Sequence, residues 1–152
     1  MVELAKALIQ YNISISSVES FTVGNFAAML GSIPGISKVY RGSLITYQSE
    51  TKERLLGISH EAINKYGVVS KEIASLMCIN GKQILDSDIC VSFTGNAGPE
   101  AMEGKPVGLV YIGIIYEGIN IYELKLKGSR VEIQQQAIDF VIKKLVEKIK
   151  VK

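Results

Sequence analysis

Apolar residues along this chain recur at two different spacings, and these spacings predict alternating helices and strands. Where they return every three or four positions, as in Leu4, Ala7, Leu8 and Tyr11, they share one face of a helix. This pattern predicts a helix at 2–11. A run of small residues predicts a helix at 24–30, and serines at the entry predict helices at 49–56, 59–66 and 70–84, with a last helix that begins at 129–132. Runs rich in β-branched residues predict strands at 13–19, 39–47, 88–93, 107–116 and 119–126. Helices interleaved with about five strands indicate a single α/β domain over residues 1–152, with α/β/α layers and a mixed, mostly parallel sheet.

Turn and cap residues mark where several of these elements begin and end. Pro34 cannot continue a helix and ends the second one, while Glu117 and Gly118 are typical of a hairpin between the last two strands. Serines stand at the expected starts of three helices, where a side-chain oxygen satisfies free N–H groups: Ser49, Ser59 and Ser70. The S-x-x-E spacing of Ser129 and Glu132 is typical of a capping box that opens the last helix. The apolar stripe of that helix is Ile138, Val141, Ile142, Leu145 and Ile149.

Composition narrows the class of protein. A chain of 152 residues with 47% hydrophobic and 21% charged residues can bury a core without a disulfide or metal staple. The net charge of +2 is too small to indicate nucleic-acid binding, and the late lysines fall on a helical pattern typical of a solvated face. Cys78 and Cys90 lie in apolar runs, and the single histidine, His60, excludes a histidine-rich metal site. No apolar run approaches the ~20 residues that span a bilayer, so a soluble, cytoplasmic protein is expected.

Three polar segments follow apolar strands, at 19–22, 46–52 and 94–99. Ligands of open α/β sheets bind outside the carboxyl ends of the strands, so these segments are candidates for one site. Ser20 has two interpretations: a cap for the following helix, or a nucleophile beside backbone N–H groups that hold an oxyanion. Lys52 has two as well: a solvated surface charge, or a buried base whose pKa is lowered by desolvation.

Two further features of the sequence suit an anion. The turn at 94–99 contains two glycines, and its exposed N–H groups can cradle a phosphate or carboxylate. Arg130 begins the last helix, whose positive end is an unfavourable place for a cation unless an anion binds there. An ordinary loop and a surface arginine are the alternatives. The 94–99 turn matches no dinucleotide or triphosphate motif.

Six motifs in order resemble the C-terminal CinA domain family, whose characterised members are nicotinamide mononucleotide amidohydrolases. They are "ESFTVG" (19–24), "GSLITYQSETKERLLGI" (42–58), "YGVVS" (66–70), "TGNAGP" (94–99), "KPVG" (105–108) and "KGSR" (127–130). The resemblance covers the chain from about residue 14 to the last helix. It implies hydrolysis of the carboxamide of a pyridine mononucleotide, with release of ammonia.

The resemblance also implies roles for individual residues. Ser20 attacks the carboxamide, Lys52 accepts its proton, and Tyr47 orients Lys52 or the pyridine ring. N–H groups at the start of the helix after Ser20 hold the oxyanion. The residues expected to contact the substrate are Glu19, Thr22, Gly24, Thr94, Gly95 and Arg130, with Arg130 on the phosphate. No metal or cofactor, no nucleic acid and no membrane is implied, and a homodimer is expected.

Two residues beside Ser20 depart from the family pattern. Phe21 stands where the family has a small cysteine, and Val23 stands where it has a glycine. Both are expected to shape the substrate pocket and to weaken activity. These departures motivate an alternative function, in which a CinA-like fold is kept as a ligand-binding or interaction protein without catalysis.

Overall fold

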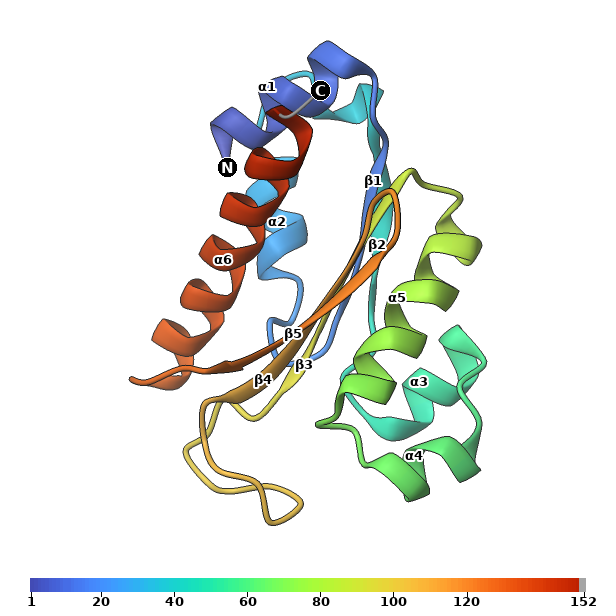
Figure 1. Ribbon diagram of the computed structural model, residues 1–152, viewed down its shortest axis with the longest axis vertical. Helices are drawn as coiled ribbons and strands as arrows, with labels where there is room; N and C mark the ends of the chain where they lie inside the picture. Colours follow the sequence, from blue (N-terminus) through green and yellow to red (C-terminus); the bar gives the residue numbers. More distant parts are fainter. Residues whose placement is uncertain (151–152) are drawn as a thin grey trace.

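The computed structural model describes residues 1–150 and shows one five-stranded sheet with helices on both faces (Figure 1). The strands are β1 (Ile15–Glu19), β2 (Tyr40–Ile45), β3 (Ile89–Gly95), β4 (Leu109–Ile115) and β5 (Ile119–Lys125). The helices are α1 (Val2–Tyr11), α2 (Asn25–Gly31), α3 (Ser49–Leu56), α4 (His60–Tyr66), α5 (Lys71–Leu85) and α6 (Arg130–Lys150), with a short 3₁₀ helix, η1, at Ile36–Lys38.

The sheet is mixed, with strand order β2-β1-β3-β4-β5. β1 pairs in parallel with β2 and β3, whereas β4 runs antiparallel to both of its neighbours, β3 and β5. Every residue of β1 and β3 is buried, because helices cover both faces of the parallel centre. The edge strands β2 and β5 are only partly covered. The predicted mixed, mostly parallel sheet is confirmed.

Helices α1, α2 and α6 cover one face of the sheet, and α3, α4 and α5 cover the other (Figure 1). The first core cluster contains Leu4, Phe26 and Ile138, and the second contains Leu56 and Met77. Gly81 of α5 packs so closely on the sheet that an added Cβ would overlap the side chain of Val18. The three-layer arrangement predicted from the sequence is therefore confirmed.

The helix ends agree with the predicted caps in three cases out of four. Ser59 and Ser70 accept hydrogen bonds from the N–H groups of Ala62 and Ile73, at 3.1 and 3.2 Å. The capping box also forms, since the Ser129 N–H donates to Glu132 Oε2 at 2.7 Å and the Glu132 N–H to Ser129 Oγ at 3.4 Å. The prediction for Ser49 is wrong, because the extended residue before α3 is Gln48 and Ser49 already belongs to the helix.

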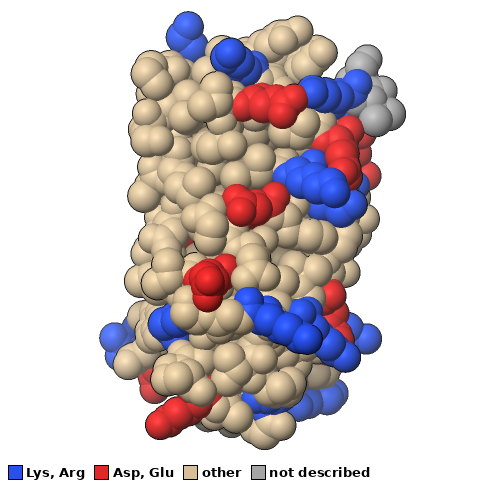
Figure 2. Space-filling view, turned by 90° about the vertical axis from the view of Figure 1, so that its left-hand side faces the viewer, with Lys and Arg blue, Asp and Glu red and all other residues tan. Residues whose placement is uncertain are grey.

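The face formed by α1 and α6 carries basic side chains interspersed with acidic ones (Figure 2). Lys144 pairs with Glu147 at 3.1 Å, and Lys150 pairs with Glu3. This mixed surface is typical of a solvated helix face, as the sequence predicted. Over residues 1–150, every helix is too short or too polar to cross a membrane.

The carboxyl ends of β1, β2 and β3 lie at the same edge of the sheet. Their register places Glu19 beside Ile45 on one side and beside Phe93 on the other. The polar segments that follow these strands therefore meet at one place.

Candidate active site

Ser20 lies in the turn that leaves β1, and its side chain is only 8% exposed. Its N–H donates to the Phe93 carbonyl at 3.0 Å, which continues the β1–β3 pairing by one residue and fixes the backbone of Ser20. The residue before helix α2 is Gly24, and the N–H groups at the start of this helix donate to the Glu19 carboxylate, not to Ser20. The interpretation of Ser20 as a helix cap is therefore wrong.

Lys52 is buried beneath Ser20, with 1% of its surface exposed. Its Nζ lies 3.1 Å from Ser20 Oγ, 2.6 Å from the Thr46 carbonyl oxygen and 3.3 Å from the Tyr47 carbonyl oxygen. Burial lowers the pKa of Lys52 to about 8, and the negative charge of Glu103 acts in the opposite direction. The alternative of a solvated surface lysine is wrong, because α3 turns this side chain towards the end of β1.

Three oxygens surround Lys52, and its Nζ donates to each of them, which matches the three N–H donors of the charged ammonium. A neutral amine has two N–H donors and one lone pair. When Lys52 loses a proton, the carbonyls of Thr46 and Tyr47 still accept its two N–H donors, and its lone pair faces Ser20 Oγ. The Ser20 hydroxyl, which donates to the Tyr47 carbonyl at 3.4 Å, can then turn to Lys52. The arrangement holds Lys52 in the geometry of a general base for Ser20.

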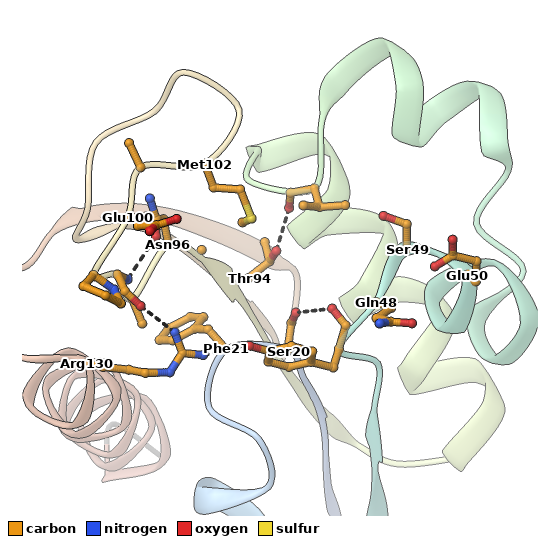
Figure 3. A pocket seen from close by; sticks show the side chains of 17 residues that line it. Ser20, Phe21, Gln48, Ser49, Glu50, Thr94, Asn96, Glu100, Met102 and Arg130 are labelled. Carbon is orange, nitrogen blue, oxygen red and sulfur yellow. Dashed lines mark hydrogen bonds between the residues drawn. The ribbon is translucent and has the colours of Figure 1, made fainter.

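A cavity of about 750 Å³ opens in front of Ser20 (Figure 3). Its lining includes Ser20, Phe21, Tyr47, Thr94, Asn96 and Arg130, and the 94–102 segment forms one wall. Cavities of roughly 300–1,000 Å³ are typical of sites for small molecules. A mononucleotide is a ligand of the size that such cavities hold.

The structure brings five of the predicted site residues to this cavity: Ser20, Tyr47, Thr94, Gly95 and Arg130. Arg130 donates from Nη1 to the Gly98 carbonyl at 2.8 Å and from Nη2 to the Tyr47 hydroxyl at 2.9 Å. The Thr94 hydroxyl donates to the Val68 carbonyl at 2.6 Å. Tyr47 contacts Lys52 through its carbonyl oxygen, while its hydroxyl accepts from Arg130.

Glu19, Thr22 and Gly24 do not line the cavity. The Glu19 carboxylate is fully buried and accepts hydrogen bonds from the Thr22 hydroxyl at 2.8 Å and the Gly24 N–H at 2.9 Å. It also accepts from the N–H groups of Phe26 and Ala27, at 3.3 and 2.9 Å. Negative side chains stabilise the positive end of a helix. These three residues hold the turn around Ser20, whereas the resemblance implied substrate contact.

The predicted source of the oxyanion hole also needs correction. The N–H groups at the start of α2 are already bound by Glu19, so they are not free for a substrate oxygen. In residues 1–150, the N–H groups of Phe21 and Thr22 have no hydrogen-bond partner, and they immediately follow Ser20. The Gln134 amide, from α6, donates to the Phe21 carbonyl at 2.7 Å and fixes this peptide plane. The Phe21 N–H, on a residue that lines the cavity, is the better candidate for an oxyanion donor.

The two residues that depart from the family pattern lie in different environments. Phe21 is buried, lines the cavity and packs edge-on against Phe93 with ring centroids 6.5 Å apart. Val23 is 51% exposed, lies outside the cavity and has a left-handed φ of 51°. The prediction that both shape the pocket therefore holds for Phe21 and is wrong for Val23.

Comparison with known proteins identifies the family of this chain. Residues 1–149 match the model of the CinA C-terminal domain. The chain belongs to the CinA C-terminal domain family. It is 45% identical over 111 residues to a competence-damage inducible protein of Listeria innocua, and 39% identical over 137 residues to one of Levilactobacillus brevis. These matches cover 73% and 89% of this chain but 27% and 33% of the relatives, so the chain spans about a quarter to a third of their length.

Solved structures of the CinA superfamily have the same fold. A superfamily protein from Klebsiella pneumoniae superposes with a TM-score of 0.94 at 27% identity, covering 99% of this chain and 96% of that one. The CihA protein from Agrobacterium tumefaciens superposes with a TM-score of 0.88 at 29% identity, covering 95% and 93%. The CinA-type fold of the whole described domain is thereby shown. The names of these proteins state no reaction.

Proposed function

We propose that this CinA-family domain hydrolyses the carboxamide of nicotinamide mononucleotide, giving nicotinic acid mononucleotide and ammonia. The observation that carries the proposal is the buried pair of Lys52 Nζ and Ser20 Oγ, 3.1 Å apart at the base of a cavity. A pKa of about 8 leaves about half of the Lys52 side chains neutral at pH 8, so the base is available near physiological pH. The reaction itself is the one implied by the resemblance.

In the first half of the proposed reaction, Ser20 Oγ forms a bond to the carboxamide carbon and its proton passes to Lys52 Nζ. The substrate oxygen becomes an oxyanion, and the N–H group of Phe21 would stabilise it. Lys52 then returns the proton to the amide nitrogen as the C–N bond breaks. Ammonia leaves, and the acyl group remains on Ser20.

In the second half, water attacks the acyl carbon and Lys52 takes one of its protons. The bond to Ser20 Oγ breaks, the proton returns to that oxygen, and the carboxylic acid product leaves. No group is oxidised or reduced, and the free enzyme is restored. Lys52 serves as base in each attack and as acid in each departure.

Arg130 is the proposed partner of the substrate phosphate. A guanidinium has five N–H donors, and the Gly98 carbonyl and the Tyr47 hydroxyl accept two of them. The remaining donors are sufficient for a bidentate phosphate contact at the cavity. Phe21 and Met102 line the same cavity and provide apolar surface for the pyridine ring.

Ammonia release from nicotinamide mononucleotide tests the proposal directly. We expect turnover by the unmodified chain and a loss of at least about a thousandfold in kcat for Ser20→Ala, as for other serine nucleophiles. Ser75→Ala, on the far helix α5, is the matched control and should keep full activity. Full activity of Ser20→Ala would remove the nucleophile from the proposal. Calorimetric binding of the mononucleotide without ammonia release would support the alternative of a non-catalytic binding protein.

The homodimer implied by the resemblance stays a prediction. Sedimentation should give about twice the 16.6 kDa of one chain, and a mass near 16.6 kDa would contradict it.

A further inference from the structure

The loop at 96–108, between β3 and β4, forms a wall of the cavity and contacts a distant part of the chain. Asn96, Gly98, Glu100 and Met102 of this loop line the cavity (Figure 3). The loop also meets the segment at 66–70, which comprises the last residue of α4 and the connection to α5, and whose Val68 lines the same cavity. The position of this wall therefore depends on how the loop is attached to the 66–70 segment.

Glu103 makes the attachment. Its Oε1 accepts from the Val68 N–H at 2.9 Å, and its Oε2 accepts from the Val69 N–H at 3.2 Å. Lys105 lies 3.7 Å from the same carboxylate and donates to the Val69 carbonyl. The Glu103 carboxylate thus accepts from two consecutive backbone N–H groups, and Lys105 donates to the carbonyl of the second of these residues. Hydrogen bonds from backbone N–H groups to a charged carboxylate are among the stronger ones in proteins.

The local backbone is adapted to this contact. Gly67 has a φ of 74°, and a Cβ added there would lie 2.6 Å from Glu103 Oε2, so a larger residue would displace the carboxylate. Glu103 has a left-handed φ of 55°, which is unfavourable for a residue with a side chain. Glu103 and Gly104, whose φ is 68°, are the two central residues of a tight turn closed by the bridge between Met102 and Lys105, and such a turn takes positive φ at both positions.

Glu103 also acts on the base of the proposed reaction. The groups in contact with Lys52 Nζ are the Ser20 hydroxyl and the carbonyls of Thr46 and Tyr47, none of them charged. The Glu103 carboxylate supplies the charge that raises the pKa of Lys52 against the effect of burial. The loop attachment and the proton affinity of Lys52 are therefore linked through one residue.

We propose that Glu103 is a positioning residue of this site, which clasps the 96–108 loop to the 66–70 segment and fixes the wall of the cavity relative to Ser20 and Lys52. The proposal rests on the proposed function of the cavity. Glu103 acts through the loop and through Lys52, since it does not line the cavity itself.

The test compares Glu103→Gln with Glu61→Gln, which removes an exposed carboxylate from α4. Amide hydrogen exchange at Val68 and Val69 should accelerate at least tenfold in Glu103→Gln and remain unchanged in Glu61→Gln. This readout requires no turnover. Unchanged exchange in Glu103→Gln would overturn the clasp, whether or not the chain releases ammonia.

Kinetics decide whether the clasp positions the site. In Glu103→Gln, we expect the KM for nicotinamide mononucleotide to rise about tenfold while kcat changes less than threefold. The midpoint of kcat/KM against pH should move to lower pH, because the removed negative charge had raised the pKa of Lys52. If the substitution only loosened the loop, water would reach Lys52 and raise its pKa, and the midpoint would move to higher pH. Faster hydrogen exchange together with an unchanged KM, or with a midpoint at higher pH, would overturn the positioning role. Absence of ammonia release from the unmodified chain would instead contradict the proposed function.

Discussion

Replacing Lys52 by Met should remove a pH-dependent part of the stability of this domain. The pKa of Lys52 is 10.5 in an unfolded chain and about 8 in the folded domain, because burial disfavours the charged form. Between these two values the unfolded state binds more protons, so the contribution of Lys52 to the free energy of unfolding rises with pH. Below pH 8 both states are protonated, and the cost of burying the charge is constant.

The size of the effect follows from the fall in pKa from 10.5 to about 8, which corresponds to about 3 kcal/mol. The side chain is 1% exposed, so solvent does not reduce this figure much. Met has a similar length but leaves the carbonyls of Thr46 and Tyr47 without their donor. That loss is independent of pH and cancels when the pH dependence of the two proteins is compared.

Urea unfolding at several values from pH 7 to pH 10.5 measures the effect. The free energy of unfolding of the unmodified chain minus that of Lys52→Met should rise by about 3 kcal/mol across this range. Every other titrating group is shared by the two proteins and cancels. A difference that stays flat would show that Lys52 keeps an ordinary pKa in the folded state, and the argument for a buried base would fail.

Two further variants test the turn around Ser20. Val23→Gly should stabilise the domain by about 0.5–1 kcal/mol in urea unfolding, because a β-branched residue at a φ of 51° is strained and its side chain is half exposed; a loss of stability would refute this. Glu19→Gln should destabilise the domain by about 2–3 kcal/mol, because an amide NH₂ would face the N–H groups that now donate hydrogen bonds to the carboxylate. Glu50→Gln, in the exposed first turn of α3, is the control for Glu19 and should change stability by less than about 0.5 kcal/mol.

Much of the fold could be predicted because it depends on local patterns. The fully buried strand β3 lies on a nearly continuous apolar run, and β1 has Ile15 and Val18 in a run that ends at Glu19. The parallel pairing of β1 and β3 brings the polar segments that follow them together. The candidate pair of Ser20 and Lys52 could be proposed on the same grounds, together with the family motifs. The 3.1 Å contact between their side chains agrees with that expectation.

Other features depend on where individual side chains point, which the sequence pattern does not show. Glu19 adjoins Ser20, but the turn directs its carboxylate to the start of α2 and away from the cavity. Gln134 and Glu103 were missed because each acts on backbone far away in the chain: Gln134 on Phe21 and Glu103 on Val68. A polar residue on the apolar face of the last helix is the one signal that indicates Gln134.

The proposed role of neutral Lys52 as the base for Ser20 is tested most directly by the pH dependence of kcat/KM for ammonia release from nicotinamide mononucleotide. This quantity reports the pKa of essential groups in the free enzyme. We expect kcat/KM to rise with pH to a plateau with a midpoint near pH 8, where Lys52 loses its proton. A profile that is flat or falls between pH 6.5 and pH 9.5 would contradict the assignment of Lys52 as the base.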